Sequence, residues 1–151
     1  MAAVELKKFK AISHRISLNI PAGCQWAWDD KFRHALVVFA REDLELILLP
    51  IRLEFEQKLD FTTIDGSAAM ISEFVHSGFG LMPGQDFFIT QDTVHRDIIL
   101  YATCWPWGDG DNFSLRIGIF CSRKDLINSR QIRDCLTEWF PIDTALIKGP
   151  G

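Results

Sequence analysis

Hydrophobic and polar residues alternate near the start of the chain, which is the pattern of a strand with one buried face. Over Ile12–Ile20, the residues Ile16, Leu18 and Ile20 share one side, and polar residues occupy the other. This segment is therefore predicted to be a strand that ends at Pro21-Ala22-Gly23.

Three further segments in the first half of the chain are predicted as strands. Gln25–Trp28 keeps a period of two, and His34–Ala40 is rich in Val, Leu and Phe, as expected for a strand covered on both faces. Leu44–Glu56 is longer, and its second half alternates between apolar and charged residues. Pro50 cannot donate to a strand ladder, so it indicates a sheet edge, a bulge or a bend there.

A helical period follows in the middle of the chain. Ile71, Phe74 and Val75 have helical spacing and predict a helix over Ala68–Ser77, which the glycines beyond it would stop. The next stretch, 80–84, is predicted to be a connecting loop.

Strands return after this loop. Phe87–Thr90 and Thr93–Cys104 are predicted strands, with Gln91-Asp92 as a hairpin turn between them. Trp105–Asn112 carries the strongest turn signal of the chain. Strict alternation follows, and it predicts a strand whose apolar residues point into the core beneath the last helix: Phe113, Leu115, Ile117 and Ile119.

The last element is predicted to be a helix of about 15 residues. Its apolar stripe contains Ile132, Leu136, Trp139 and Phe140, and Pro141 ends it. The element order predicts an α+β fold, with an antiparallel sheet packed by two main helices. We expect one domain over residues 1–151, with a folded core at about 9–147.

The opening strand resembles that of Mog1/PsbP-like domains. The residues that carry the resemblance are Ile16-Ser17-Leu18-Asn19-Ile20-Pro21-Ala22-Gly23, followed by an aromatic residue, and the later element order is similar over nearly the whole chain. The resemblance implies an α/β sandwich and a binding role, since members are mostly accessory or binding proteins. They include a nuclear-transport factor and photosystem extrinsic subunits. No functional residue is transferred, because no motif matches.

A second resemblance is to secretion chaperones, which are small, acidic and of mixed α/β build. Those proteins usually begin with a helix, whereas this chain is predicted to begin with a strand. This makes the second resemblance the more distant of the two.

Composition and charge limit the classes of partner and the cellular compartment that fit this sequence. Sixteen Lys and Arg against twenty Asp and Glu give a net charge of −4, which argues against nucleic acid as a partner. The longest apolar run, Leu46–Ile51, is far too short to span a membrane, and no signal peptide is evident. The four cysteines lack the spacing of a disulfide framework and are predicted to be free thiols in the cytoplasm.

No catalytic or metal-binding signature is evident. The four histidines have no metal-ligand spacing, and no nucleophile motif is present. The glycines at 78–84 follow a predicted helix instead of preceding one, so they do not form a phosphate loop. The acidic loop at 109–112 lacks the glutamate that an EF-hand requires. We therefore predict no catalytic residue, metal or other cofactor.

Two pairs of tryptophans form the first candidate binding site: Trp26 with Trp28, and Trp105 with Trp107. Residues i and i+2 of a strand share a face, so each pair would form a side-by-side indole platform. These indoles either cap the core or meet a partner or ligand.

A polar sheet face is the second candidate. It would hold Arg52, Glu54 and Glu56 on one strand, and Tyr101 with His95 and Asp97 on another. This face is either solvated or docks a partner.

The function predicted from these features is a non-catalytic cytoplasmic binding protein of accessory, adaptor or immunity type, acting through a protein partner. Its predicted contacts are the four tryptophans with Tyr101 and Arg52. One alternative is a small-ligand-binding or enzymatic domain with a cleft near the tryptophans, which converging polar groups of shifted ionisation would favour. Another is a secretion chaperone.

Overall fold

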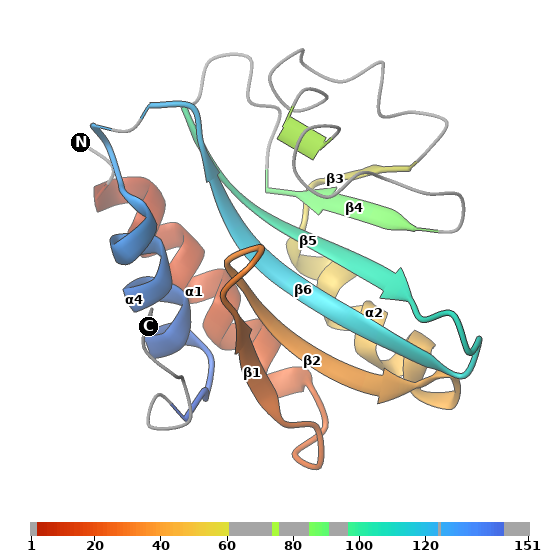
Figure 1. Cartoon of the computed structure of the whole chain (residues 1–151). Helices are drawn as coiled ribbons and strands as arrows, with labels where there is room; N and C mark the ends of the chain where they lie inside the picture. The colour runs from red at the N-terminus through yellow and green to blue at the C-terminus, as the bar shows by residue number, and fades with distance from the viewer. Residues whose placement is uncertain (1–2, 61–73, 76–84, 91–96, 124, 144–151) are drawn as a thin grey trace.

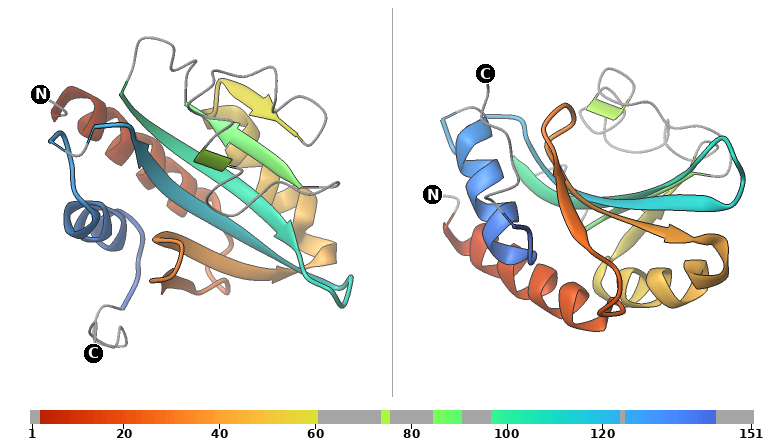
Figure 2. Two further views of the ribbon diagram at one scale, coloured as in Figure 1. Left: turned by 45° about the horizontal axis from the view of Figure 1, so that its top comes forward. Right: turned by 60° about the horizontal axis from the view of Figure 1, so that its bottom comes forward.

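Six strands form one open antiparallel sheet in the computed structural model, which describes residues 3–60, 74–75, 85–90, 97–123 and 125–143. The strand order is β1-β2-β6-β5-β4-β3, and every pair of neighbours is antiparallel. Three α-helices in the described part of the chain pack on one face of this sheet (Figures 1 and 2). The predicted α+β class with an antiparallel sheet is confirmed, but only α4 of these three helices was predicted, since α1 and α2 both fall where strands were expected.

The elements follow one another in the order α1 (Ala3–Asn19), β1 (Trp26–Asp29), β2 (His34–Ala40), a 3-10 turn (Arg41–Asp43), α2 (Leu44–Glu54), β3 (Gln57–Leu59), β4 (Asp86–Ile89), β5 (Ile98–Pro106), β6 (Asn112–Cys121) and α4 (Ser129–Trp139). Helix α1 lies between α4 and α2 beneath the sheet (Figure 1).

The strand predicted at Ile12–Ile20 is wrong, because these residues belong to α1. Helical spacing runs through a longer window, in which the buried apolar residues are Phe9, Ile12, Ile16 and Ile20. A window of five residues satisfies both periods, whereas the longer window satisfies only the helical one. Residues 16–23 thus end a helix and do not form the opening strand that suggested Mog1/PsbP-like domains, so that resemblance stays a prediction.

The strand predicted at Leu44–Glu56 is also wrong, because Leu44–Glu54 is helix α2. Pro50 lies inside this helix, where it cannot donate a hydrogen bond to the preceding turn. Burial of Pro50 with Ile47 and Ile51 against the sheet outweighs this loss. Three leucines on the opposite side of α2 are exposed, which hid its amphipathic pattern in the sequence.

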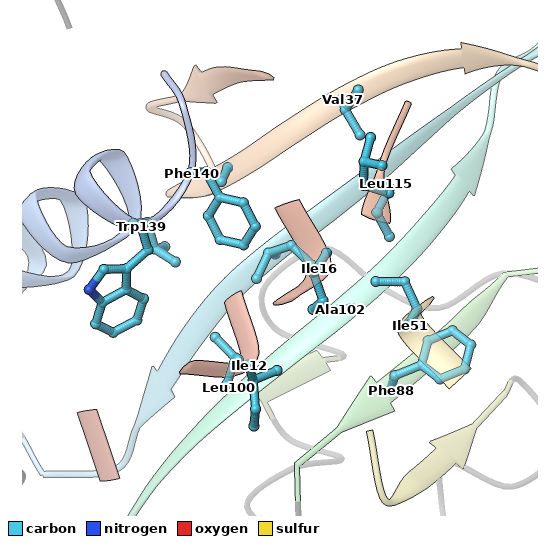
Figure 3. Packing of buried hydrophobic residues seen from close by; sticks show 14 of the residues in the cluster. Ile12, Ile16, Val37, Ile51, Phe88, Leu100, Ala102, Leu115, Trp139 and Phe140 are labelled. Carbon is cyan, nitrogen blue, oxygen red and sulfur yellow. The ribbon is translucent and has the colours of Figure 1, made fainter. Parts of the chain in front are cut away.

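Strands β1, β2, β4, β5 and β6 lie close to their predicted places, whereas β3 corresponds to no predicted strand. Strand β6 points its alternating apolar residues toward the helices as expected. Leu115, Ile117 and Ile119 are buried there, and Phe113 packs on the edge of the same core. Figure 3 shows this core from within, with α1, α2 and α4 contributing to it. Its labelled members are Ile12, Ile16, Val37, Ile51, Phe88, Leu100, Ala102, Leu115, Trp139 and Phe140.

Helix α4 confirms the predicted C-terminal helix. Asn128 caps its first turn, because the Asn128 side chain accepts from the amide of Gln131 at 2.9 Å and the Gln131 side chain accepts from the amide of Asn128 at 2.9 Å. Leu136 and Trp139 are the buried residues of its apolar stripe, and Pro141 lies just beyond the end of the helix.

Of the helix predicted at Ala68–Ser77, only Phe74 and Val75 are described, and both are helical. The rest of that segment lies outside the described residues, as do the loop at 80–84, the turn at Gln91-Asp92 and residues 93–96.

Candidate functional site

The face of the sheet opposite α1, α2 and α4 carries a second apolar cluster, in which Phe74 and Val75 pack with Tyr101 and Phe87, and polar and aromatic side chains lie beside it. Strand residues alternate between the two faces, so the neighbours of the buried core residues point to this second face. The β1–β2 hairpin adds to them, and we call six of these residues the aromatic-polar cluster: Asp29, Phe32, His34, Tyr101, Trp105 and Arg116.

Arg116 is the centre of the aromatic-polar cluster. Its guanidinium lies 4.0 Å from the centre of the Trp105 ring and 5.8 Å from that of Phe32. The same group forms a salt bridge with Asp29 on β1, and its Nε donates to the Ser114 hydroxyl at 3.2 Å. Because both members of the salt bridge are largely buried, this pair fastens the edge strand β1 to the central strand β6.

Asp29 also shapes the hairpin turn. Its Oδ1 accepts from the backbone amides of Lys31 at 2.9 Å and Phe32 at 3.4 Å. Burial alone would raise the pKa of the Asp29 carboxyl, but the hydrogen bonds from Arg116 and these amides outweigh burial and lower that pKa below its ordinary value. Asp29 is therefore an ion that holds the turn in place.

His34 and Tyr101 form a buried pair next to Arg116. The His34 Nε2 and the Tyr101 hydroxyl are 2.7 Å apart, and both residues are buried. Burial, together with the positive charge of Arg116, lowers the pKa of His34 to about 3. Burial also raises the pKa of Tyr101 far above its ordinary value. Both rings are thus neutral at physiological pH, and neither changes its charge there.

Gly118 makes this contact between strands possible. It is paired with Tyr101 across the β5–β6 ladder. A Cβ at position 118 would lie 2.5 Å from Cζ and Oη of Tyr101 and 2.9 Å from Cδ2 of His34. The Tyr101 ring therefore lies over Gly118 of β6, which has no side chain, and so contacts His34 on β2.

A pocket of about 440 Å³ opens beside the cluster. Its wall is mainly apolar and joins the hairpin to the start of α4, through Phe32, Tyr101, Phe120, Ile127 and Ile132. Arg33 of the hairpin turn lines it as well, with a φ of 57°, which few residues other than glycine adopt.

A second pocket of about 630 Å³ adjoins the first, since Arg33 and Ser129 line both. It is bordered by Trp28 and Asp30 of the hairpin and by charged residues of α4. We call the two pockets together the hairpin groove, which lies where α4 runs beside the β1–β2 hairpin (Figure 1).

The charged end of the hairpin groove carries three arginines, Arg33, Arg130 and Arg133. In the part of the chain that the structure describes, no carboxylate lies within salt-bridge distance of any of them. The groove thus combines an apolar end with an end that offers guanidinium groups.

Besides Arg33, two groups whose pKa values are shifted line the apolar pocket, and both are held in their neutral forms. They are Tyr101 and Cys121, and burial is the main cause that raises the pKa of each. The Cys121 thiol also donates to the carbonyl of Arg123 at 2.9 Å. Shifts of ionisation are present, as the enzymatic alternative requires, but their direction opposes formation of a thiolate or phenolate nucleophile.

Three of the predicted contact residues lie at the groove or in the cluster. Trp28 is half-buried and lines the charged pocket. Trp105 is half-buried under Arg116, and Tyr101 is buried while still forming part of the apolar pocket wall.

The other three lie apart from the groove. Trp26 is buried and packs on Phe140 with ring centres 4.4 Å apart, so it belongs to the core. Trp107 is 46% exposed near the turn between β5 and β6. Arg52 lies on α2, where it pairs with Glu45 at 2.8 Å.

The polar sheet face predicted to join Arg52 with Tyr101 does not exist. Arg52 and Glu54 are on a helix beneath the sheet, whereas Tyr101 is on the opposite side of the sheet. His95 lies outside the described residues. The error follows directly from interpreting α2 as a strand.

The sequence did not reveal the residues that build the groove. Arg116 was placed only by alternation, on the polar side of a strand. Phe32 and Arg33 lie between two predicted strands, and Arg130 and Arg133 lie in the predicted C-terminal helix, but the pattern indicates no role for any of the four. The sequence contains only a weak indication of the buried ion pair, namely one arginine between the apolar residues of a strand.

Comparisons with protein-family models, curated proteins and solved structures find no match to this chain. Among the described residues, no helix is long and apolar enough to cross a membrane. No group of three or more His, Cys, Asp or Glu side chains suited to a metal ion occurs in the described ranges. All four cysteines carry free thiols.

Proposed function

We propose that this chain is a non-catalytic cytoplasmic binding protein, of accessory, adaptor or immunity type, that holds an extended segment of a partner protein in the hairpin groove. The observation that carries the proposal is the continuity of an apolar pocket with an arginine-lined pocket through Arg33 and Ser129. A peptide segment with apolar residues followed by acidic ones fits this sequence of surfaces.

The charges of the groove favour an acidic peptide over a nucleic acid. Asp30 and Asp134 line the same pocket as the three arginines, and the whole chain has a net charge of −4. A long phosphate backbone would meet these carboxylates, whereas one or two acidic side chains can select the guanidinium groups. The aromatic wall formed by Trp28 and Phe32 supplies the flat apolar contacts on which protein interfaces concentrate their affinity.

The contacts that hold the groove wall in place support binding of a partner. The salt bridge between Arg116 and Asp29 holds the hairpin, and the neutral pair of His34 and Tyr101 lies behind it. A wall already ordered before binding loses little entropy when a partner docks.

Photo-crosslinking tests the proposal. A benzophenone amino acid at Ser129, within the groove, is expected to capture a partner in native lysate, and the same group at Lys58, on the opposite edge strand, is expected not to. The captured segment is then titrated against the purified chain.

Charge reversal in the groove gives the second arm of the test. Arg130→Glu with Arg133→Glu is expected to weaken binding of the captured segment by about tenfold or more, while Lys58→Glu leaves it unchanged. Trp107→Ala tests the other predicted contact, the exposed turn. Unchanged affinity in the double groove variant would contradict the groove, and loss in Trp107→Ala alone would move the site to that turn.

The secretion-chaperone alternative gains one supporting observation. The strand predicted at Ile12–Ile20 argued against it, and those residues lie in helix α1 or directly after it. The two proposals differ in the state of the partner. A chaperone is expected to keep the captured segment protease-sensitive and unfolded outside the groove, whereas an adaptor is expected to bind a folded partner. Limited proteolysis of the complex distinguishes the two.

A further inference from the structure

Helix α2 exposes a row of leucines on the side that faces away from the sheet. Leu46 is 53% exposed, Leu49 54% and Leu53 75%. Positions three and four apart lie on one side of a helix, so the three side chains form a single stripe over two turns. We call this the leucine stripe. The buried side of the same helix is equally apolar, which leaves α2 without a fully polar face.

A shallow groove runs along one edge of the leucine stripe, between α2 and the end of α1. It measures about 190 Å³ and is lined by the three leucines with Pro50, Asn19 and Glu54. Each copy of the chain therefore offers both protruding leucines and a recess beside them. Such a surface can bury itself against another copy by packing ridges into grooves.

The other edge of the leucine stripe carries one charge of each sign. Glu45 is near the start of α2 and Arg52 near its end, about 10 Å apart along the helix axis at 1.5 Å per residue. The Glu45 side chain is 77% exposed and that of Arg52 is 44% exposed, and they meet at 2.8 Å. If α2 packs against a second α2 in the antiparallel direction, each Glu45 lies beside the other copy's Arg52.

We propose that the leucine stripe is the interface of a homodimer, in which two α2 helices pack antiparallel about a two-fold axis near Leu49. An isologous interface requires one surface to complement itself, and this stripe does so in both shape and charge. Leu46 of each copy meets Leu53 of the other. Glu45 of each copy then pairs with Arg52 of the other copy instead of with its own.

The charges around the stripe select this occupant over an anionic membrane surface. The preceding turn carries Glu42 and Asp43 with Arg41, whose Nε donates to the carbonyl of Gly110, and the helix itself carries Glu45 and Glu54 with Arg52. Acidic side chains therefore outnumber basic ones by four to two over residues 41–54. Negative surfaces repel such a patch, whereas the paired signs of Glu45 and Arg52 match an inverted copy of themselves. The hairpin groove uses none of these residues, so this proposal and the proposed function stand or fall separately.

Sedimentation equilibrium of the whole chain tests the proposal. The wild-type chain is expected to behave as a dimer, at twice its mass of 17.3 kDa. Leu49→Asp is expected to weaken dimerisation at least about tenfold. Val4→Asp is the matched control, because Val4 is a more exposed apolar residue near the far end of α1, and it is expected to stay dimeric. Circular dichroism checks that both variants fold.

A charge-exchange experiment tests the antiparallel register. Glu45→Arg places two arginines on each edge, and Arg52→Glu places two glutamates there, so each variant alone is expected to dissociate. When the two variants are mixed, every arginine faces a glutamate of the other chain, and dimers are expected to return as heterodimers.

Two outcomes overturn the proposal. The first is a wild-type chain that remains monomeric, or a Leu49→Asp variant that dimerises as well as the wild type. The second is a mixture of the two charge variants that forms no heterodimers although each variant is folded. Recovery of heterodimers only in the mixture supports the two-fold pairing of α2.

Discussion

The aromatic-polar cluster shows how single residues control the second face of the sheet. Arg116 is held by a carboxylate, a hydroxyl and two aromatic rings, and its charge helps keep the neighbouring His34 neutral. Replacing one member removes the partner of a buried charge or leaves a gap beside a buried ring. Either change destabilises the fold, because a buried charge without a partner is unfavourable in a low dielectric.

Gly118→Ala is expected to destabilise the chain by about 1–3 kcal/mol, because the new methyl group overlaps the rings of Tyr101 and His34. The free energy of unfolding in urea measures this loss. Gly108→Ala is the matched control, since a Cβ there meets no atom within 4 Å, and it is expected to change stability by less than about 0.5 kcal/mol. Equal losses in the two variants would contradict the steric argument.

The buried imidazole of His34 is expected to make stability fall with decreasing pH. Its pKa is about 3 in the native state, against 6.5 in the unfolded chain. Above pH 6.5 the ring is neutral in both states. Between pH 6.5 and 3 the unfolded chain binds a proton that the native chain does not, so stability falls by up to about 1.4 kcal/mol per pH unit.

Urea unfolding at pH 7 and pH 5 measures this slope. His34→Gln is expected to flatten it, whatever its own effect on stability at neutral pH. His14→Gln, at an exposed position on α1, is expected to retain the wild-type slope. A wild-type slope in His34→Gln would show that another group dominates this pH range.

At the scale of elements, the helices bury one face of the sheet, and they were the hardest elements to predict. Strand β6 lies close to its predicted range because alternation over several residues has no helical equivalent. Strand β2 was predicted instead from its Val, Leu and Phe content, which is typical of a strand covered on both faces. Helix α1 was mistaken for a strand over a five-residue window, and α2 because its leucine stripe blurred the pattern and Pro50 argued against a helix. The groove could not be predicted, since it joins a hairpin turn to a helix about 100 residues later.

Trp139→Ala is expected to cost about 3–5 kcal/mol, the usual range for removing a buried large aromatic side chain. Trp139 closes the buried stripe of α4 and is 9% exposed, and α4 has only its two buried residues, Leu136 and Trp139, within the helix itself. Denaturant unfolding measures the loss. Glu138→Ala, on the exposed side of the same turn, is expected to cost far less. A loss below about 1 kcal/mol would show that Trp139 is not part of the core.

At the scale of the whole molecule, the two proposed surfaces lie apart. The hairpin groove is at α4 and the β1 edge, while the leucine stripe is on α2, on the other side of α1 (Figure 2). A dimer formed through α2 would leave both grooves open. A partner with two copies of the recognised segment would then bind with increased avidity.

The buried thiol of Cys104 offers a probe of global opening. Burial, with a contribution from Asp86, raises the pKa of Cys104 to about 12, whereas the other three cysteines are partly exposed. A disulfide reagent is expected to modify at most three thiols in the native chain, and the fourth only in urea. Cys104→Ala is expected to abolish this last reaction. Rapid modification of all four thiols without urea would contradict the burial.

Gly118 also has a consequence for the evolution of this chain. The Tyr101 ring and the His34 imidazole fill the space that a side chain at position 118 would need, although the three residues lie on three different strands. A lineage that acquires a side chain at position 118 is expected to lose stability until the residue at position 101 becomes smaller, and His34 then loses its hydrogen bond to Tyr101. The three positions should therefore be inherited as a unit, and substitutions among them should appear together in any set of descendants.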